Sequence, residues 1–468
     1  MTDYGMVIDL ERCIGCNACA VSCSQENNVS LDKQWNRILT EGGDAMDTPE
    51  GSYPENGRDG TLSMNHLPLA CQHCDNAPCV KVCPVNATYK RDDGIVEIDY
   101  DKCMGCRYCM SACPYNARVF NFDDPKTLPT DGTGNVEERK RGVVEKCTFC
   151  SHRLEEDLDP ACTVACPADA RIFGDLDDEE STASRYVEKY ETEQLLDELE
   201  TDPNTYYIRG EMSPVEREAA TNSREPRRKT SGTPTASRPT EVTANEFRVG
   251  RRRRRSPLRN AGQSLARPAG RADRGRARCL AYQLQQGLAV TGMDNVFSWG
   301  LYIMLFVLFI GLSAGGLIIS SAPKFFHSKR YDSLAALGVL LSLGCIVVAG
   351  LLILPDLGSP SRVTGFLTSP DPRSPMVWDF GIVLLYGLFN VGYLWLLTRR
   401  DLAKMGSRLA FGVEDTPAGR ERDRKRAFWA AAIAMPLAVG LHSVTGWIFA
   451  TQIGRGDWFN RWSRRCSS

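Results

Sequence analysis

The sequence predicts an α+β chain in two parts, a cysteine-rich domain followed by a bundle of four transmembrane helices. Sixteen of the 19 cysteines lie between Cys13 and Cys166, in four groups of four. Four apolar runs of about 20 residues or more lie between residues 299 and 450, and each is long enough to span a bilayer as a helix. At 468 residues the chain is also too long for one ordinary domain.

The net charge of −2 is a cancellation between segments of opposite sign. Residues 1–180 hold 33 Asp and Glu against 17 Lys and Arg, whereas residues 248–278 hold 12 Arg against one Asp. We therefore expect a cysteine-rich domain at residues 1–180, a charged, arginine-rich and disordered linker at 181–290, and a membrane domain at 291–455. The N-terminus has no basic segment followed by an apolar one, so we expect no secretory signal peptide.

The spacing of the cysteines is typical of iron–sulfur ligands. In each group a CxxC pair precedes a third cysteine, and a fourth follows the third after three residues. The groups are Cys13, Cys16, Cys19 and Cys23; Cys71, Cys74, Cys79 and Cys83; Cys103, Cys106, Cys109 and Cys113; and Cys147, Cys150, Cys162 and Cys166. Three thiolates on one loop can wrap a cubane, and the fourth reaches a neighbouring cluster. Zinc sites and a disulfide framework are the alternatives, but zinc needs only two CxxC pairs and such frameworks belong to small secreted domains.

Crossed ligation between groups two and three, which are adjacent, and between groups one and four around them predicts four ligand sets. These are Cys71, Cys74, Cys79 with Cys113; Cys103, Cys106, Cys109 with Cys83; Cys13, Cys16, Cys19 with Cys166; and Cys147, Cys150, Cys162 with Cys23. The segments VIDLERCIGC and EIDYDKCMGC are an internal repeat, which favours a ferredoxin-like fold of two two-cluster repeats. A line of four clusters conducts electrons. We see no nucleophile, general base or nucleotide-binding loop beside it, so we expect no catalytic residues.

The four apolar runs are predicted to be helices at about 299–322, 334–354, 376–398 and 427–450. The small residues of Gly311–Gly316 favour close helix packing. Nine Lys and Arg follow the third run and three follow the first, but only Arg362 and Arg373 follow the second. The positive-inside rule therefore places the second loop, and with it the cysteine-rich domain, on the extracytoplasmic side. The arginines before the first helix favour the opposite orientation.

Three segments carry a resemblance to a known family. LPLACQHCDNAPCVKVCPVNATYK, DKCMGCRYCMSACPYNARVF and EKCTFCSHRL resemble the four-cluster iron–sulfur subunits of the molybdopterin oxidoreductase family, which includes dimethyl sulfoxide, polysulfide and tetrathionate reductases. Residues 293–455, with WGLYIMLFVLFIGLSAGGLIISS and HSVTGWIFATQIGR, resemble the first half of a polysulfide reductase membrane subunit. The resemblance implies a membrane-bound electron-transfer subunit with four [4Fe-4S] clusters, which acts beside a molybdopterin catalytic subunit. It also implies quinol or menaquinol as exchangeable substrate, and it leaves room for a further membrane subunit.

Quinol oxidation releases two protons with two electrons, so a carboxylate or imidazole is needed beside the ring. Ionisable residues within membrane spans are costly and therefore mark candidate sites. Asp356, Asp379 and His442 are these candidates here. Helix capping by Asp356 and simple packing of His442 are the structural alternatives.

Three other interpretations stay open at this point. Electrons could flow in reverse, from the catalytic subunit to quinone. The breaks in composition near Asn245 and Thr291 would also arise if two adjacent genes had been joined by a gene-model error. The tract Arg251–Arg255 could attract nucleic acid, but we favour a solvated linker as its explanation, and we therefore expect no nucleic-acid partner.

Overall fold

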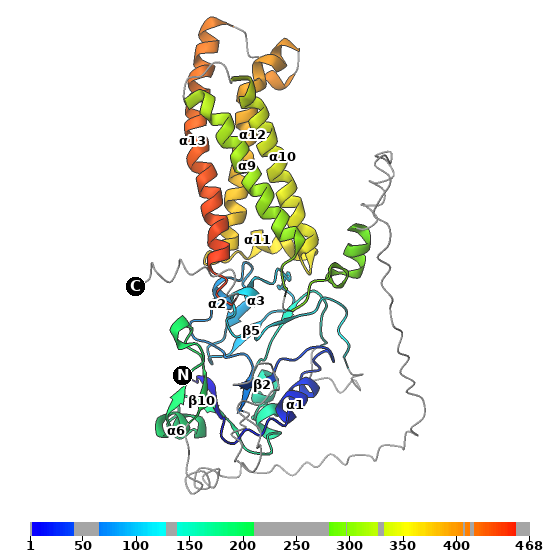
Figure 1. Cartoon of the computed structure of the whole chain (residues 1–468), viewed down its shortest axis with the longest axis vertical. Helices are drawn as coiled ribbons and strands as arrows, with labels where there is room; N and C mark the ends of the chain where they lie inside the picture. Colours follow the sequence, from blue (N-terminus) through cyan, green and yellow to red (C-terminus); the bar gives the residue numbers. More distant parts are fainter. Residues whose placement is uncertain are drawn as a thin grey trace, which may run out of the picture. The chain divides into compact units, whose positions relative to one another are not determined.

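The computed structural model describes residues 2–41, 65–127, 138–209, 280–295, 297–325, 332–405, 408–411 and 416–454. The tract Arg251–Arg255 and most of the expected linker lie outside these residues. Residues up to Glu211 and from Tyr282 onward form one compact unit (Figure 1). Within it, we call the described residues 2–209 the cysteine-rich region and the described residues 282–454 the helical region.

The cysteine-rich region is organised around a four-stranded sheet of order β8-β1-β10-β9. The strands are β1 (Tyr4–Asp9), β8 (Arg171–Asp175), β9 (Thr192–Glu193) and β10 (Thr205–Ile208). Strand β1 pairs antiparallel with β8 and parallel with β10. Because β1 lies between two partners, five of its six residues are buried, and it reads as a continuous apolar run.

The folded part of this region extends beyond residue 180, where the sequence analysis placed its boundary. Strand β10 completes the sheet, and helix α6 (Thr182–Lys189) precedes it. Tyr207 of β10 is fully buried, and its hydroxyl donates a hydrogen bond to the carbonyl of Pro68 at 3.1 Å. The polar composition of residues 181–204 conceals this pairing, because they form the surface connection to a short buried strand.

Three antiparallel strand pairs and five short helices surround the sheet. The pairs are β2 (Arg37–Glu41) with β3 (Asn65–Leu69), β4 (Thr88–Lys90) with β5 (Val96–Ile98), and β6 (Val119–Phe120) with β7 (Val144–Glu145). The helices are α1 (Ala18–Glu26), α2 (Pro78–Lys81), α3 (Tyr108–Ala112), α4 (Ser151–Leu154) and α5 (Ala161–Val164). The third cysteine of every group lies on one of these helices, so each cysteine loop feeds directly into a helical turn.

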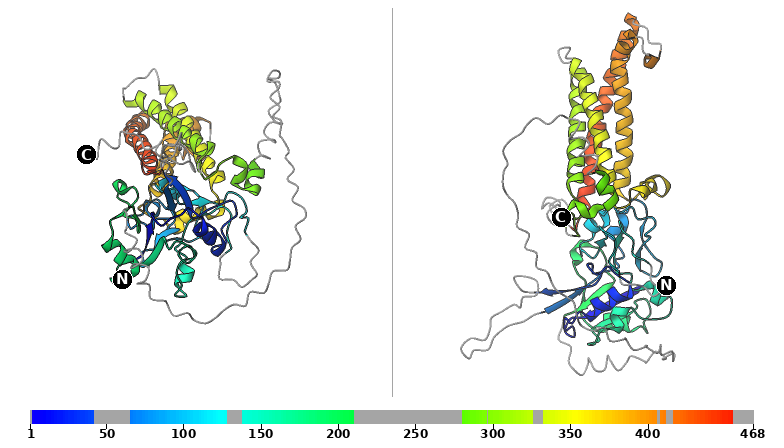
Figure 2. Two further views of the ribbon diagram at one scale, coloured as in Figure 1. Left: turned by 60° about the horizontal axis from the view of Figure 1, so that its bottom comes forward. Right: turned by 90° about the vertical axis from the view of Figure 1, so that its right-hand side faces the viewer.

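Four long helices form the helical region, as the apolar runs predict. They are α9 (Leu301–Phe325), α10 (Asp332–Ile353), α12 (Pro375–Lys404) and α13 (Pro417–Ala450), and each is long and apolar enough to cross a membrane. Figure 2 shows the four side by side. Helices α12 and α13 extend past their apolar runs into charged turns at the end where Arg399 and Arg400 pair with Asp423.

Small residues allow the helices to approach closely. A Cβ atom on Gly316 of α9 would lie 2.8 Å from the carbonyl oxygen of Gly338 on α10, so only glycine fits there. The close contact at Gly316, the last residue of the Gly311–Gly316 segment, confirms the packing role predicted for that segment. Deeper in the bundle, Ser313, Ser342 and Tyr386 are fully buried and hydrogen-bond one another.

The loops of the cysteine-rich region meet one end of the bundle directly. The amide of Ser359, which follows α10, donates to the carbonyl of Met104 at 2.9 Å, and the guanidinium of Arg362 donates to that of Cys103 at 2.8 Å. The hydroxyl of Tyr108 donates to the carbonyl of Ile448 near the end of α13 at 3.1 Å. The third cysteine group therefore lies against the helix ends.

Candidate functional site

The cysteine loops are shaped by residues in the left-handed backbone conformation. Asn17 and Arg107 (φ 60° and 62°) stand between the second and third cysteines of groups one and three. His73 and Phe149 stand inside the CxxC pairs of groups two and four, with φ of 47° and 52°. Non-glycine residues seldom adopt this conformation, so its recurrence in all four loops indicates a constrained site.

A second recurrent turn follows the fourth cysteine of groups two, three and four. Asn86, Asn116 and Asp169 occupy the third position after that cysteine, with φ of 50°, 48° and 49°. Asn and Asp tolerate this conformation better than other residues with side chains. The turn aims backbone amides at sulfur, because Thr88 N lies 3.3 Å from Cys83 Sγ and Ala170 N lies 3.3 Å from Cys166 Sγ.

The structure brings two of the four expected ligand sets together around small cavities. One cavity is lined by Cys13, Cys16, Cys19 and Cys166. Another is lined by Cys23, Cys147, Cys150 and Cys162, and also by Cys71 of the second group. In both, the fourth thiol comes from the group at the other end of the cysteine-rich sequence.

The other two sets are also adjacent. Burial raises the pKa of Cys109 to about 12; the charge of Arg118 opposes this rise, and those of Cys103 and Cys83 add to it. Burial raises the pKa of Cys113 to about 11, and the charges of Cys79 and Cys71 contribute. Cys83 thus lies with group three and Cys113 with group two. Because such buried thiols hold their protons strongly, only a bound cation would keep them as thiolates.

Buried cations stand beside these thiols. Arg118 is 2% exposed, and its Nη2 lies 2.9 Å from Cys79 Sγ. Arg171 is equally buried, with Nη1 3.8 Å from Cys162 Sγ. Sequence reasoning missed both arginines, although each is the fifth residue after a fourth cysteine, in CPYNAR and CPADAR.

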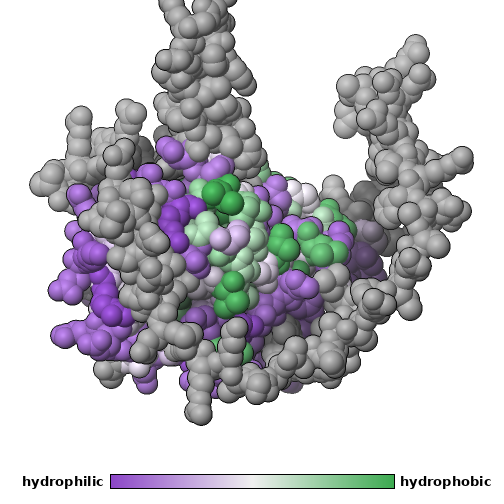
Figure 3. Space-filling view, turned by 90° about the horizontal axis from the view of Figure 1, so that it is seen from below, coloured by the Kyte–Doolittle hydropathy of each residue, from purple (hydrophilic) through white to green (hydrophobic). Residues whose placement is uncertain are grey.

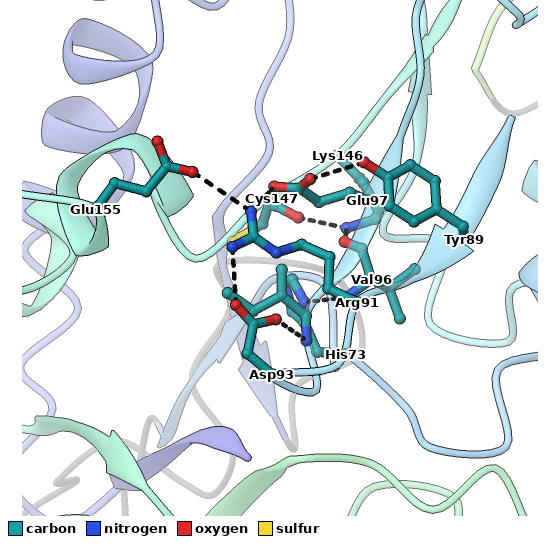
Figure 4. Close-up of polar contacts among 10 residues, drawn as sticks. His73, Tyr89, Arg91, Asp93, Val96, Glu97, Lys146, Cys147 and Glu155 are labelled. Carbon is teal, nitrogen blue, oxygen red and sulfur yellow. Dashed lines mark hydrogen bonds and ion pairs between the residues drawn. The ribbon is translucent and has the colours of Figure 1, made fainter. Parts of the chain in front are cut away.

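Lys146 is a third buried cation, next to Cys147 in the sequence. Figure 4 shows its amine among the residues of the β4–β5 hairpin, where it donates to the carbonyls of Val96 and Cys147. The amide of Val96 donates in turn to His73 Nδ1 at 3.1 Å. Burial lowers the pKa of His73 well below its ordinary value, and the charge of Lys146 lowers it further. His73 is therefore a neutral packing group.

A mostly apolar cavity of about 230 Å³ lies where the third cysteine group meets the helix bundle. Its walls include Cys106, Trp299, Asp356, Phe366, Asp379 and Phe449. The indole nitrogen of Trp299 donates to the carbonyl of Cys106 at 3.0 Å, which fixes the ring beside the cysteine loop. Asp356 and Asp379 are 3% and 4% exposed, so they are the polar features of an otherwise hydrophobic chamber.

The three candidate quinol residues are not all in one place. The structure brings Asp356 and Asp379 together at the cavity. His442 lies on α13 with an exposed side chain, near Gly311 of α9, and is not among the residues that line the cavity. The position of His442 follows from the periodicity of helix α13. Thr445, one turn after His442, lies on the face of the helix that contacts Asp379.

The two parts of the chain that the sequence predicts match different protein families. Residues 289–462 match the family described as Polysulphide reductase, NrfD. Residues 62–128 and 133–176 match one family described as 4Fe-4S dicluster domain, and residues 12–87 match another of the same description.

Two similar relatives come from Halobacterium salinarum, and both are named as parts of a dimethyl sulfoxide reductase. The chain is 72% identical over 214 residues to the iron-sulfur subunit of that reductase, covering 46% of this chain and 82% of that relative. It is 75% identical over 180 residues to the membrane subunit, covering 38% of this chain and 41% of that relative. The chain thus spans less than half of the membrane relative's length.

A third relative is the "Menaquinone reductase, iron-sulfur cluster-binding subunit" of Nitratidesulfovibrio vulgaris. It is 39% identical over 239 residues, covering 44% of this chain and 88% of that relative. The chain therefore belongs to the family of iron–sulfur subunits that contains the first and third of these relatives, and it carries an NrfD-type membrane domain on the same polypeptide.

Proposed function

We propose that this chain carries electrons between a quinol in the cavity and a separate molybdopterin catalytic subunit, through four [4Fe-4S] clusters. The observation that carries the proposal is the composition of the cavity wall. Cys106, a predicted cluster ligand, and two membrane carboxylates face the same chamber. A quinol there would lie beside both an electron acceptor and proton acceptors.

The four predicted ligand sets define the clusters of this proposal. We assign them as cluster 1 (Cys13, Cys16, Cys19, Cys166), cluster 2 (Cys71, Cys74, Cys79, Cys113), cluster 3 (Cys103, Cys106, Cys109, Cys83) and cluster 4 (Cys147, Cys150, Cys162, Cys23). The grouping of thiols around two cavities, and the electrostatic proximity of the rest, support this assignment. Bound clusters would supply one-electron transfer at each step.

The charges that influence the cysteine pKa values link the sets in a single order for the route. Cys109 of cluster 3 lies close enough to Cys79 of cluster 2 for the charge of Cys79 to raise its pKa. Burial raises the pKa of Cys147 of cluster 4, and the charge of Cys71 of cluster 2 adds to the rise. Burial likewise raises the pKa of Cys19 of cluster 1, and the charge of Cys162 of cluster 4 adds to that rise. Electrons would therefore pass from the cavity through clusters 3, 2 and 4 to cluster 1.

Cluster 1 has the most exposed surroundings, which suits exchange with a partner subunit. Cys16 is exposed, and the neighbouring Ile14 is 64% exposed. Val21 on α1 and Val164 on α5 present further apolar side chains of similar exposure. Figure 3, seen from below, shows hydrophobic residues gathered within a largely hydrophilic surface of the cysteine-rich region. We place the docking surface of the catalytic subunit around Ile14.

The distribution of basic residues supports an extracytoplasmic position for the cysteine-rich region. That region contacts the helix ends near Ser298, Ser359, Ser374 and Ile448. The opposite ends carry the basic residues of α12 and α13, among them Arg399, Arg400 and a run of arginines between 420 and 426. By the positive-inside rule those ends face the cytoplasm.

The proposal is tested with the purified full chain under anaerobic conditions. Iron and acid-labile sulfide should correspond to four cubanes, and menadiol, a soluble naphthoquinol, should reduce a fraction of the clusters, followed by electron paramagnetic resonance. Clusters that dithionite reduces but menadiol does not would contradict the quinol step. Bound zinc in place of iron and sulfide would contradict the whole proposal. Electron flow from the catalytic subunit to quinone would use the same route in reverse.

A further inference from the structure

A buried ion pair joins the loop of cluster 3 to the wall of the cavity. Arg107 Nη2 lies 2.6 Å from Asp356 Oδ2, and the two side chains are 0% and 4% exposed. Arg107 stands directly after Cys106 in the chain, whereas Asp356 follows helix α10. The pair therefore connects the predicted electron acceptor to a carboxylate of the cavity.

The guanidinium of Arg107 is held in place by other contacts. Its Nε donates to the carbonyl of Ser298 at 2.6 Å, and its Nη1 donates to that of Gly105 at 3.4 Å. The guanidinium carbon also lies 5.2 Å from the centre of the Phe120 ring. A buried guanidinium stays charged and needs a counter-charge. Asp356 supplies it, which requires that Asp356 remain ionised.

The second oxygen of Asp356 is left for a ligand. Asp356 Oδ1 is buried and has no hydrogen-bond partner among the described residues. An unsatisfied buried carboxylate oxygen is costly, and Asp356 lines the cavity. A hydroxyl group bound in the cavity would satisfy that oxygen.

Asp379 differs from Asp356 in its surroundings. Its Oδ1 accepts a hydrogen bond from the hydroxyl of Thr445 at 2.7 Å. Within the described part of the chain, no Lys, Arg or His forms an ion pair with it, in contrast to the Arg107 partner of Asp356. A carboxylate without a cation gains a proton more readily than one with a cation 2.6 Å away.

We propose that Arg107 is a positioning residue that gives the two carboxylates different roles, one in binding quinol and one in accepting protons. This inference rests on the proposed function. Asp356, kept ionised by Arg107, accepts a hydrogen bond from one quinol hydroxyl and orients the ring. Asp379 is the proton acceptor. Each electron passes singly to the iron–sulfur cluster bound by Cys106. Each of the two protons passes to Asp379, which releases the first to water before it takes the second, so that quinol becomes quinone.

The test measures cluster reduction by menadiol in the full chain, as a maximal rate and a half-saturating concentration. Asp379→Asn should lower the maximal rate about 100-fold with little change in half-saturation, as expected for loss of a general base. Asp356→Asn should raise half-saturation about tenfold, as expected for loss of a hydrogen bond to a charged group. Asp371→Asn is the matched control. Asp371 is a buried carboxylate paired with Arg373 outside the cavity, so its replacement should change neither parameter.

Variants of Arg107 test the positioning role itself. Arg107→Gln should raise half-saturation as Asp356→Asn does, and the double variant should be no worse than either single one, because both changes remove the same ionised oxygen. Arg107→Lys retains the charge and should restore part of the binding. It also keeps the test available should Arg107→Gln fail to fold.

The outcomes separate this inference from the proposed function. Equal effects of the Asp356 and Asp379 variants on one parameter would overturn the division of roles. Independent, multiplying effects of Arg107→Gln and Asp356→Asn would overturn the positioning role. Failure of menadiol to reduce wild-type clusters that dithionite does reduce would instead refute the quinol step on which the inference stands.

Discussion

Replacement of Arg118 by Met should lower the reduction potential of one cluster. Arg118 is buried, and its guanidinium contacts Cys79 Sγ at 2.9 Å and Thr88 Oγ1 at 3.3 Å. Burial lowers the pKa of Arg118, but the thiolates of Cys79 and Cys109 raise it well above its ordinary value, so the side chain is always charged. Met is unbranched like the stem of Arg and carries no charge. The variant therefore removes one positive charge from beside cluster 2.

The size of the shift follows from Coulomb's law. The negative charge of a cluster spreads over its iron and sulfur atoms, so the effective separation from the guanidinium is about 5 to 8 Å. At an effective dielectric constant of about 20 the interaction is about 2 to 3 kcal/mol. For a one-electron couple this corresponds to a fall in potential of about 90 to 140 mV. Arg118→Lys keeps the charge and should give a smaller shift.

An electron paramagnetic resonance redox titration of the full chain measures this shift. The midpoint potential of one cluster should fall, while total iron and the other midpoints stay the same. Arg91→Met is the control, because Arg91 is partly exposed and pairs with Asp93 and Glu97, so solvent screens its charge. A fall of less than about 30 mV, or a rise, would refute the assignment of Arg118 as an electrostatic partner of a cluster.

Three further variants test the ligands and the close packing. Cys106→Ala should remove one of the four proposed clusters, lower iron content by about a quarter and abolish reduction by menadiol, since Cys106 lines the cavity. Gly358→Val should slow menadiol oxidation and lower the melting temperature, because its side chain would overlap the carbonyl of Gly142; overpacking costs about 1 to 3 kcal/mol. Gly316→Leu should destabilise the helix bundle by a similar amount or more in detergent unfolding, because it forces α9 away from Gly338.

Each of these variants has a matched control in the chain. Cys345 is a buried cysteine of α10 outside the four groups, so Cys345→Ser should leave the iron content unchanged. Gly344 and Gly446 lie in helices with no atom within 4 Å of an added Cβ, so their replacement by Ala should leave stability and menadiol oxidation near wild type. Full iron content in Cys106→Ala would contradict the ligand assignment. Wild-type stability of Gly358→Val and of Gly316→Leu would contradict the close contacts at these two glycines.

The sequence predicted the features that depend on local spacing. The cysteine groups are close in the chain, so their loops follow from spacing alone, and the four membrane helices follow from apolar length. Asp356 and Asp379 became candidates because ionisable residues are rare in apolar runs, and the structure places both at one cavity. His442 met the same criterion, but the rotation of α13 turns Thr445, and not His442, toward Asp379. Sequence alone does not settle which face of an almost wholly apolar helix is inward.

The features that the sequence did not reveal all depend on distant pairing. Strand β10 joins β1 across almost the whole cysteine-rich region, and its polar approach resembles a linker. Arg107 and Asp356 are 249 residues apart, so their ion pair has no local signal. Burial of Arg118 and Arg171 was equally hidden, because an arginine in a turn is usually on the surface.

The central position of β1 has a consequence for how the protein is made. As the chain leaves the ribosome from its N-terminus, β1 emerges long before residues 171–175 and 205–208, which supply its two hydrogen-bonding neighbours. Until then both edges of this apolar strand are open to unwanted association. A nascent or truncated chain that stops at residue 180 would still lack β10, so recombinant fragments of this region should extend at least to Ile208.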